Sequence, residues 1–120
     1  MLFDTTQLAL ERSISGAAQR HEALSANIAN ASTPGYQRVD VDFHGALAAA
    51  MGSSDARHSI ERTSFTTQVD GTVGATRADG GTTDIDAESA KLAANALDQQ
   101  AAVSVAKTRN AILRSAMGVA

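Results

Sequence analysis

The sequence predicts a mainly α-helical chain in which long N- and C-terminal helices pack as an antiparallel, coiled-coil-like pair around a short extended and loop middle region. Each end of the chain carries an apolar repeat at steps of three and four residues, and the middle is rich in Gly, Ser and Thr. Leu, Ile, Val and Phe together make up just under one fifth of the 120 residues, while Ala is abundant. We expect one structural unit with three segments, at 1–36, 37–83 and 84–120.

The N-terminal helix is predicted over residues 5–31. Seven of the nine positions on its stripe are apolar, which is the pattern of a heptad repeat. Asp4, Thr5 or Thr6 can cap its start, and Pro34 disfavours any continuation beyond Thr33. The stripe consists of Phe3, Gln7, Leu10, Ile14, Ala17, His21, Leu24, Ile28 and Ala31.

The C-terminal helix is predicted over residues 84–117, because the same stepping continues from Ile85 to Met117. Acidic residues gather at its start and basic residues near its end, which complements the helix dipole. Thr83 followed by Asp86 resembles a capping box. The predicted stripe consists of Ile85, Ser89, Leu92, Ala96, Gln99, Val103, Ala106, Asn110, Leu113 and Met117.

The middle segment begins with an alternation of Val39 and Val41 with acidic residues, which indicates a short extended stretch. Residues 43–51 are Ala-rich and predict a short helix that stops at Gly52. We expect residues 52–83 to be mostly loop, with at most one weak strand near 65–69.

Composition excludes several classes of protein. With no Cys, the chain has no disulfide framework, thiolate zinc site or cysteine nucleophile. Its net charge of −3 argues against a nucleic-acid surface. No run of apolar residues is long enough for a membrane-spanning helix, and the N-terminus lacks the pattern of a cleaved signal. We expect no enzyme activity, cofactor or small-molecule substrate.

A metal site is the one catalytic alternative that the residues allow. Asp40, Asp42 and His44 occupy alternate positions, so a strand would place them on one face. The polar face of a solvated strand explains the same pattern, and we favour that interpretation. A metal-dependent enzyme would require all three to bind a metal.

The most specific segment runs from Leu24 to Tyr36. Asn27 and Asn30 are three residues apart, so they share a face of the last helical turns, where their amides can cap open carbonyls or bond to a neighbour. Pro34 and Gly35 make the exit sharp, and Gly35 is expected at positive φ. Tyr36 then supplies a ring with a polar tip, which suits an interface.

This segment resembles the N-terminal signature of flagellar rod and hook proteins, in which Asn-Ile-Ala-Asn is followed by Thr-Pro-Gly-Tyr. The similarity continues through residues 38–43 and resumes at residues 79–88, 94–97 and 112–116, as in FlgB-type proximal rod proteins. Residues 52–78 match nothing comparable. Distal rod and hook proteins carry a Gln-Arg and Tyr-Glu-Ala-Asn pattern where this chain has residues 99–102, so the FlgB branch is favoured.

The resemblance implies a structural subunit of the periplasmic rod of the bacterial flagellar basal body, whose terminal helices assemble into a helical tube. It implies export through the flagellar type III system without a cleaved signal. The implied partners are other rod subunits, the proteins that join the rod to the MS ring, and the export gate. The alternative is a small helical-hairpin adaptor or regulator of flagellar type III export, which would have no need of the signature. We expect the subunit interface to include Leu10, Ile14, Leu24, Asn27, Ile28, Asn30, Pro34, Gly35, Tyr36, Leu92, Val103, Asn110, Leu113 and Met117.

Overall fold

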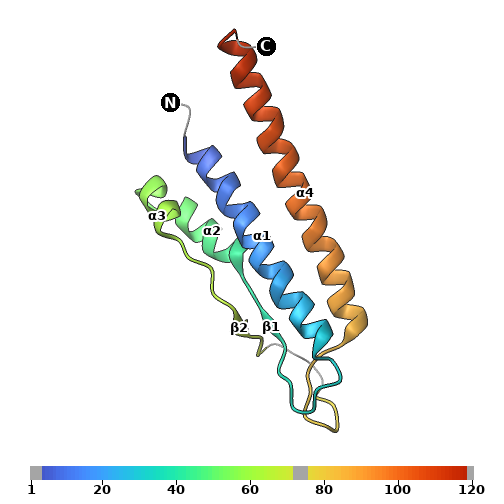
Figure 1. Cartoon of the computed structure of the whole chain (residues 1–120). Coiled ribbons are helices and arrows are strands. Elements are labelled where there is room, and N and C mark those ends of the chain that lie inside the picture. Colours follow the sequence, from blue (N-terminus) through green and yellow to red (C-terminus); the bar gives the residue numbers. More distant parts are fainter. Residues whose placement is uncertain (1–3, 72–75, 119–120) are drawn as a thin grey trace.

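The computed structural model describes residues 4–71 and 76–118 as an elongated molecule of 62 × 33 × 16 Å. Two long helices, α1 (Thr5–Ala29) and α4 (Ile85–Ala116), run antiparallel along its length. The middle of the chain packs on the side of α1 that faces away from α4 (Figure 1). The predicted fold class and the two terminal helices are confirmed. Phe3, on the predicted stripe, lies outside the described residues.

Side-chain caps define where both long helices begin. The Asp4 carboxylate accepts the Gln7 backbone N–H at 2.9 Å, as one of the predicted caps. In α4 the cap is Asp84, which accepts the backbone N–H groups of Asp86 and Ala87. The predicted capping box at Thr83 is therefore wrong, because the helix begins one residue later and the Thr83 side chain is buried.

The middle segment holds more helix than the sequence predicted. The expected short helix is present as α2 (Phe43–Met51), which ends at Gly52. A further helix, α3 (Ala56–Arg62), lies where only loop was expected, and the Asp55 carboxylate caps it. Its seven residues are too few to show a helical repeat, so the pattern could not reveal it.

The strands are minimal. β1 (Val39–Asp40) pairs antiparallel with β2 (Gln68–Val69), with Val39 opposite Val69. This two-residue ladder returns the chain alongside the exit from α1, and residues 76–84 then lead into α4.

Two small apolar clusters form the core, and both lie between α1 and the middle segment. One joins α1 to α2 and α3, and the other joins α1 to the β1–α2 region. Among the residues that the structure describes, Leu24, Val41, Phe43 and Ile60 are the bulky apolar side chains that are almost completely buried. The first cluster contains Ala9, Leu47, Ala50 and Ile60, and the second contains Ala17, Ala23, Val41 and Phe43.

The seam between α1 and α4 differs from the predicted one in its register on α4. Five positions of the predicted stripe are partly buried, as expected: Leu92, Gln99, Val103, Ala106 and Leu113. However, three other positions of the predicted stripe, Ser89, Ala96 and Asn110, are exposed. The residue just before each of them is buried or partly buried. Those residues are Glu88, Asn95 and Arg109. The predicted seam was chosen to include as many apolar residues as possible. In the structure, polar groups of α1 and of the middle segment bond to polar side chains of α4, and these contacts set which side of α4 faces α1.

Among the described residues, no helix has both the length and the apolar character needed to cross a membrane.

Gly16 lets α2 approach α1 closely. A Cβ at residue 16 would lie 2.5 Å from the Phe43 Cβ, a separation that packed atoms do not adopt. Gly16→Ala should therefore displace Phe43 from the second cluster and lower the free energy of unfolding by about 1–3 kcal/mol. Urea denaturation of the full chain measures this change.

The matched control is Gly52→Ala, since Gly52 has φ −81° and its added Cβ would meet nothing nearer than 3.5 Å. It should leave stability unchanged or raise it by a few tenths to about 1 kcal/mol. Equal stability of the two variants would show that α2 does not pack on Gly16.

Candidate functional site

Asn27 sits at the centre of a buried polar network near the end of α1. Its side-chain oxygen accepts the Val39 backbone N–H at 2.9 Å, and its amide nitrogen donates to the Val39 carbonyl at 2.7 Å. The same nitrogen donates to Glu88 on α4 at 2.9 Å. The Asn27 amide therefore bonds to β1 as the backbone of a neighbouring strand would, and it links α1 to β1 and to α4.

Glu88 and Arg38 form a buried ion pair beside Asn27. Glu88 is fully buried and the Arg38 side chain is 3% exposed. The guanidinium donates through Nε to one carboxylate oxygen and through Nη2 to the other at 3.3 Å, which is a bidentate arrangement. A carboxylate without water costs several kcal/mol unless it is paired, so the fold of α4 on α1 depends on Arg38 being in place.

Two more carboxylates complete the cluster around Arg38. Arg38 contacts Asp70 through Nη1 and Asp40 at 3.3 Å through Nη2. Asp40 also pairs in two places with Arg20 of α1, at 2.8 and 3.2 Å. The cluster links α1, β1, the residue after β2, and the first turn of α4.

Burial raises the pKa of the Asp40 carboxyl, but the hydrogen bonds from Arg20 and from the Val41 backbone N–H outweigh burial and leave that pKa below its ordinary value of 3.8. Asp40 therefore stays ionised down to acidic pH. The neighbouring carboxylates correspondingly hold the pKa of Arg38 above its usual value, although burial opposes this.

The Pro34–Gly35 turn redirects the chain into this network. Gly35 has φ +73°, as predicted, and its backbone N–H donates to the Asp79 carbonyl at 2.9 Å. Tyr36 is partly buried, accepts the Thr82 N–H through its carbonyl, and donates its hydroxyl to Asn27 at 3.3 Å. The turn after α1 thus packs against the loop before α4.

A second polar contact lies further along the seam. Asn95 of α4 is fully buried and donates to the Ala17 carbonyl of α1 at 2.8 Å. Near the far end, Arg109 of α4 pairs with the Asp4 carboxylate that caps α1. Polar contacts therefore occur at three levels of the α1–α4 seam.

The predicted interface residues differ in how far the folded chain buries them. Leu24 and Asn27 are fully buried inside the chain, and Asn30 bonds back to the Ala26 carbonyl at 2.8 Å. Ile14, Ile28, Tyr36, Leu92 and Val103 are partly buried. Pro34, Gly35, Asn110 and Met117 are exposed, and Leu10 and Leu113 line a surface groove.

The three candidate metal ligands have separate roles. Asp40 pairs with Arg20 and Arg38, the Asp42 carboxylate caps α2 by accepting the Gly45 N–H, and His44 contacts Asp98 at 3.4 Å. Within residues 4–71 and 76–118, no group of His, Asp and Glu is arranged to hold a metal ion.

Comparison with known proteins gives a consistent family. Residues 13–37, which run from the first half of α1 through the Pro34–Gly35 turn, match the model of the flagella basal body rod protein family. The FlgB flagellar basal body rod protein of Escherichia coli K12 is 37% identical over 102 residues, covering 72% of this chain and 74% of that protein. The chain belongs to the flagellar basal body rod protein family, of the FlgB type.

Shorter matches agree with this assignment. The FlgB proteins of Yersinia ruckeri and Salmonella typhimurium are each 62% identical over 34 residues, which is 28% of this chain and 25% of either protein. This rod protein is accordingly a structural subunit of the flagellar basal body, where it assembles with other rod components.

The sequence of this rod protein singles out Asn27 and Tyr36 as interface residues, whereas the structure places both in a network within the chain. The roles of two charged residues are not predicted. The sequence pattern explains Glu88 only as one of the acidic residues at the start of α4, and it gives Arg38 no separate role. One signal does point to a polar seam, because Glu88 and Asn95 are spaced by seven residues, Arg109 follows fourteen residues later, and Leu92 and Gln99 interleave with them. A polar residue repeating in a heptad indicates a specific partner across the seam.

Acid should weaken the Asp40 cluster in a predictable direction. Because the folded-state pKa of Asp40 lies below its ordinary value of 3.8, its contribution to stability is complete above that pH and is lost as pH falls through the folded-state value. Asp40→Asn should therefore flatten the loss of unfolding free energy below about pH 4. Urea titrations at a series of pH values measure it.

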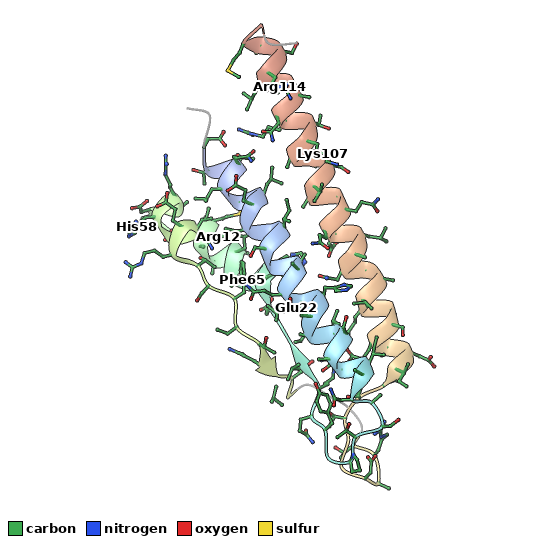
Figure 2. All side chains as sticks on the ribbon, viewed as in Figure 1. Arg12, Glu22, His58, Phe65, Lys107 and Arg114 are labelled. Carbon is green, nitrogen blue, oxygen red and sulfur yellow. The ribbon has the colours of Figure 1, made fainter. Side chains whose placement is uncertain are left out.

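The control for that experiment is Glu22→Gln, which removes one carboxylate from an exposed position of α1 (Figure 2). This variant should follow the native pH profile. If Asp40→Asn also follows the native profile, the pairing with Arg20 contributes nothing to acid stability.

Substitutions at Gly35 test whether the turn after α1 requires a positive φ. No atom outside the chain neighbours of Gly35 lies within 4 Å of the position that a Cβ would occupy, so any cost of substitution comes from the positive φ alone. Gly35→Ala should lower the free energy of unfolding by about 1 kcal/mol and Gly35→Val by about 2 kcal/mol. Thermal melts of both variants compare them, and native stability in Gly35→Val would contradict the left-handed turn.

Proposed function

We propose that this rod subunit joins the proximal part of the rod through the outer faces of its terminal helices, after export in an unfolded form by the flagellar type III system. The buried polar network is used within the subunit and fixes how α4 lies on α1. The side chains that remain exposed after folding then make the contacts with neighbouring subunits.

The apolar side chains of α4 carry this proposal. Ile85, Leu97, Val105, Ile112 and Met117 are between 50% and 67% exposed. A soluble monomer rarely leaves so many large apolar residues along one helix in water, and such surfaces mark interaction sites. Neighbouring subunits in the rod would cover them.

Two features of the chain support export in an unfolded form. Its apolar clusters are small, so unfolding for passage through a narrow channel costs little. The chain contains no Cys that could cross-link on the way. We propose the proteins that join the rod to the MS ring, and the export gate, as partners beside the other rod subunits.

Two observations favour this function over a helical-hairpin adaptor of export. The match to the rod family covers residues 13–37, which include most of α1 and the turn after it, and the FlgB similarity extends over most of the chain. The residues of the signature also build the network that positions α4, which gives them a structural use in the subunit.

A substitution at Met117 tests the proposal that exposed apolar residues of α4 contact neighbouring subunits. Met117 is 54% exposed, and the end of α4 projects past the start of α1 (Figure 1). Met117→Asp should leave expression and folding intact and abolish swimming of a strain that lacks the native chain, because a charge would replace an apolar contact. Soft-agar motility and recovery of the chain from isolated basal bodies are the measurements.

Gln100→Asp is the control, since Gln100 is an exposed polar position of the same helix. That strain should swim normally. Recovery of the native chain only from the cytoplasm, with none in basal bodies, would favour the export-adaptor alternative.

A further inference from the structure

The ladder of β1 and β2 has two edges, and the fold closes only one of them. The edge of β1 that faces α1 is closed by the Asn27 carboxamide, which bonds to both backbone groups of Val39. β2 lies on the far side of β1 from α1 (Figure 1), and β1 is the only helix or strand of the described chain that it contacts. The edge of β2 that points away from β1 therefore has no neighbouring strand.

The hydrogen bonds of the ladder show which backbone groups of β2 point to this open edge. The Asp70 N–H donates to the Arg38 carbonyl at 3.0 Å, so residue 70 faces β1. Because backbone groups alternate between the two sides of an antiparallel strand, Val69 directs its N–H and C=O to the open edge, and so does Thr67. Neither Val69 nor Thr67 has a backbone hydrogen bond to any residue that the structure describes.

The side chains of this strand show that its apolar face is incomplete. Phe65, Thr67 and Val69 alternate, so a strand places them on one face. Phe65 packs against the second cluster, with its ring centroid 6.1 Å from that of Phe43. Val69 lies opposite Val39, which packs against the same cluster, yet Val69 is 61% exposed. The apolar face of the ladder thus ends in an uncovered side chain at the open edge.

The segment before β2 has the sequence of a longer strand than the ladder uses. Residues 63–69 contain three Thr, one Phe and one Val, and no charged residue, Pro or Gly. They leave α3 without a turn or bend, but β1 offers residues 65–67 no partner because Asp42 already caps α2. At about 3.4 Å per residue, residues 65–69 present an edge about 17 Å long. Proteins commonly protect such an edge with a charged residue or Pro, and this edge has neither.

We propose that residues 65–69 bind an extended segment of a second basal-body protein, which adds to β2 as a third strand. The main chain of that segment is what the edge recognises, through the N–H and C=O groups of Thr67 and Val69. A β-branched or apolar side chain opposite Val69 continues the face that covers the second cluster. This contact is separate from the helix faces through which the subunit joins the rod.

The chemistry of the edge defines the partner segment. Residues 63–69 carry no charge, so a charged side chain packed against them would lose water without gaining a partner, and an uncharged segment fits best. A second copy of this chain is the less suitable occupant. Two identical edges that pair antiparallel close a two-fold dimer, which cannot extend along a rod.

Hydrogen exchange of the full chain, resolved by residue with NMR, tests the edge with a defined probe. The probe is a capped five-residue peptide of alternating Val and Thr, and the control is the same peptide N-methylated at every residue. At saturation the probe should slow amide exchange of Thr67 and Val69 by about tenfold and leave that of Thr66 unchanged, because strand pairing protects alternate amides. The N-methylated peptide should change nothing.

Two proline variants separate the edge from the fold. Thr67→Pro removes an N–H that points to the open edge and leaves the bonds to β1 in place. Thr66→Pro is the matched control, since the Thr66 N–H points to the other side, beyond the end of β1. Both variants should unfold in urea like the native chain. Only Thr67→Pro should weaken binding of the probe, by about fivefold, the value of one hydrogen bond.

In a strain that lacks the native chain, Thr67→Pro should impair swimming and Thr66→Pro should not. Swimming that is impaired in both strains, or in neither, would overturn the inference. So would unchanged exchange of Thr67 and Val69 with the probe. Slow exchange of these two amides that needs no probe and grows with protein concentration would show that a second copy occupies the edge. None of these results bears on the helix faces, which Met117→Asp tests.

Discussion

The carboxylate of Glu88 can lie inside this chain only because Arg38 lies there with it. Neither group touches enough water to be solvated, so each needs the other, and Asn27 contributes a further hydrogen bond to the same carboxylate. The three residues come from the end of α1, the approach to β1 and the first turn of α4. Folding is thereby tied to one relative placement of the two terminal helices, because a shifted α4 would leave a buried charge unpaired.

This constraint explains the division of surfaces in the rod subunit. The apolar clusters lie between α1 and the middle segment, so α1 is covered on that side by α2 and α3. On the other side, Glu88, Asn95 and Arg109 hold α4 through polar contacts with specific partners. Few apolar residues of α4 are needed inside, which leaves Leu97, Val105 and Ile112 on its outer face. In such a subunit, polar contacts fix the internal arrangement of the helices, and exposed apolar residues remain free to contact other subunits.

Sequence patterns predicted the elements better than their contacts. The approximate bounds of α1, α2 and α4 follow from periodicity, from the cap at Asp4, from the acidic start of α4, and from the glycine and proline positions that end helices. Gly35 follows from the geometry that a turn after Pro34 requires. The short α3 was missed because seven residues show no repeat, and the register of α4 was missed because counting apolar positions cannot show that a buried Glu88 has Arg38 as a partner. Long-range pairing of polar groups is a property of the folded chain.

Hydrogen exchange of the full chain carrying Glu88→Gln tests the central role of this ion pair most directly, with Asp86→Asn at the exposed start of α4 as the control. The account predicts that Glu88→Gln speeds amide exchange along the first half of α4 while the α1–α2 contacts keep their protection, because the unpaired Arg38 charge no longer tolerates burial under that helix. Asp86→Asn should exchange like the native chain. Native-like protection of α4 in Glu88→Gln would show that the helix pair stands without the buried charges, and the account would be wrong.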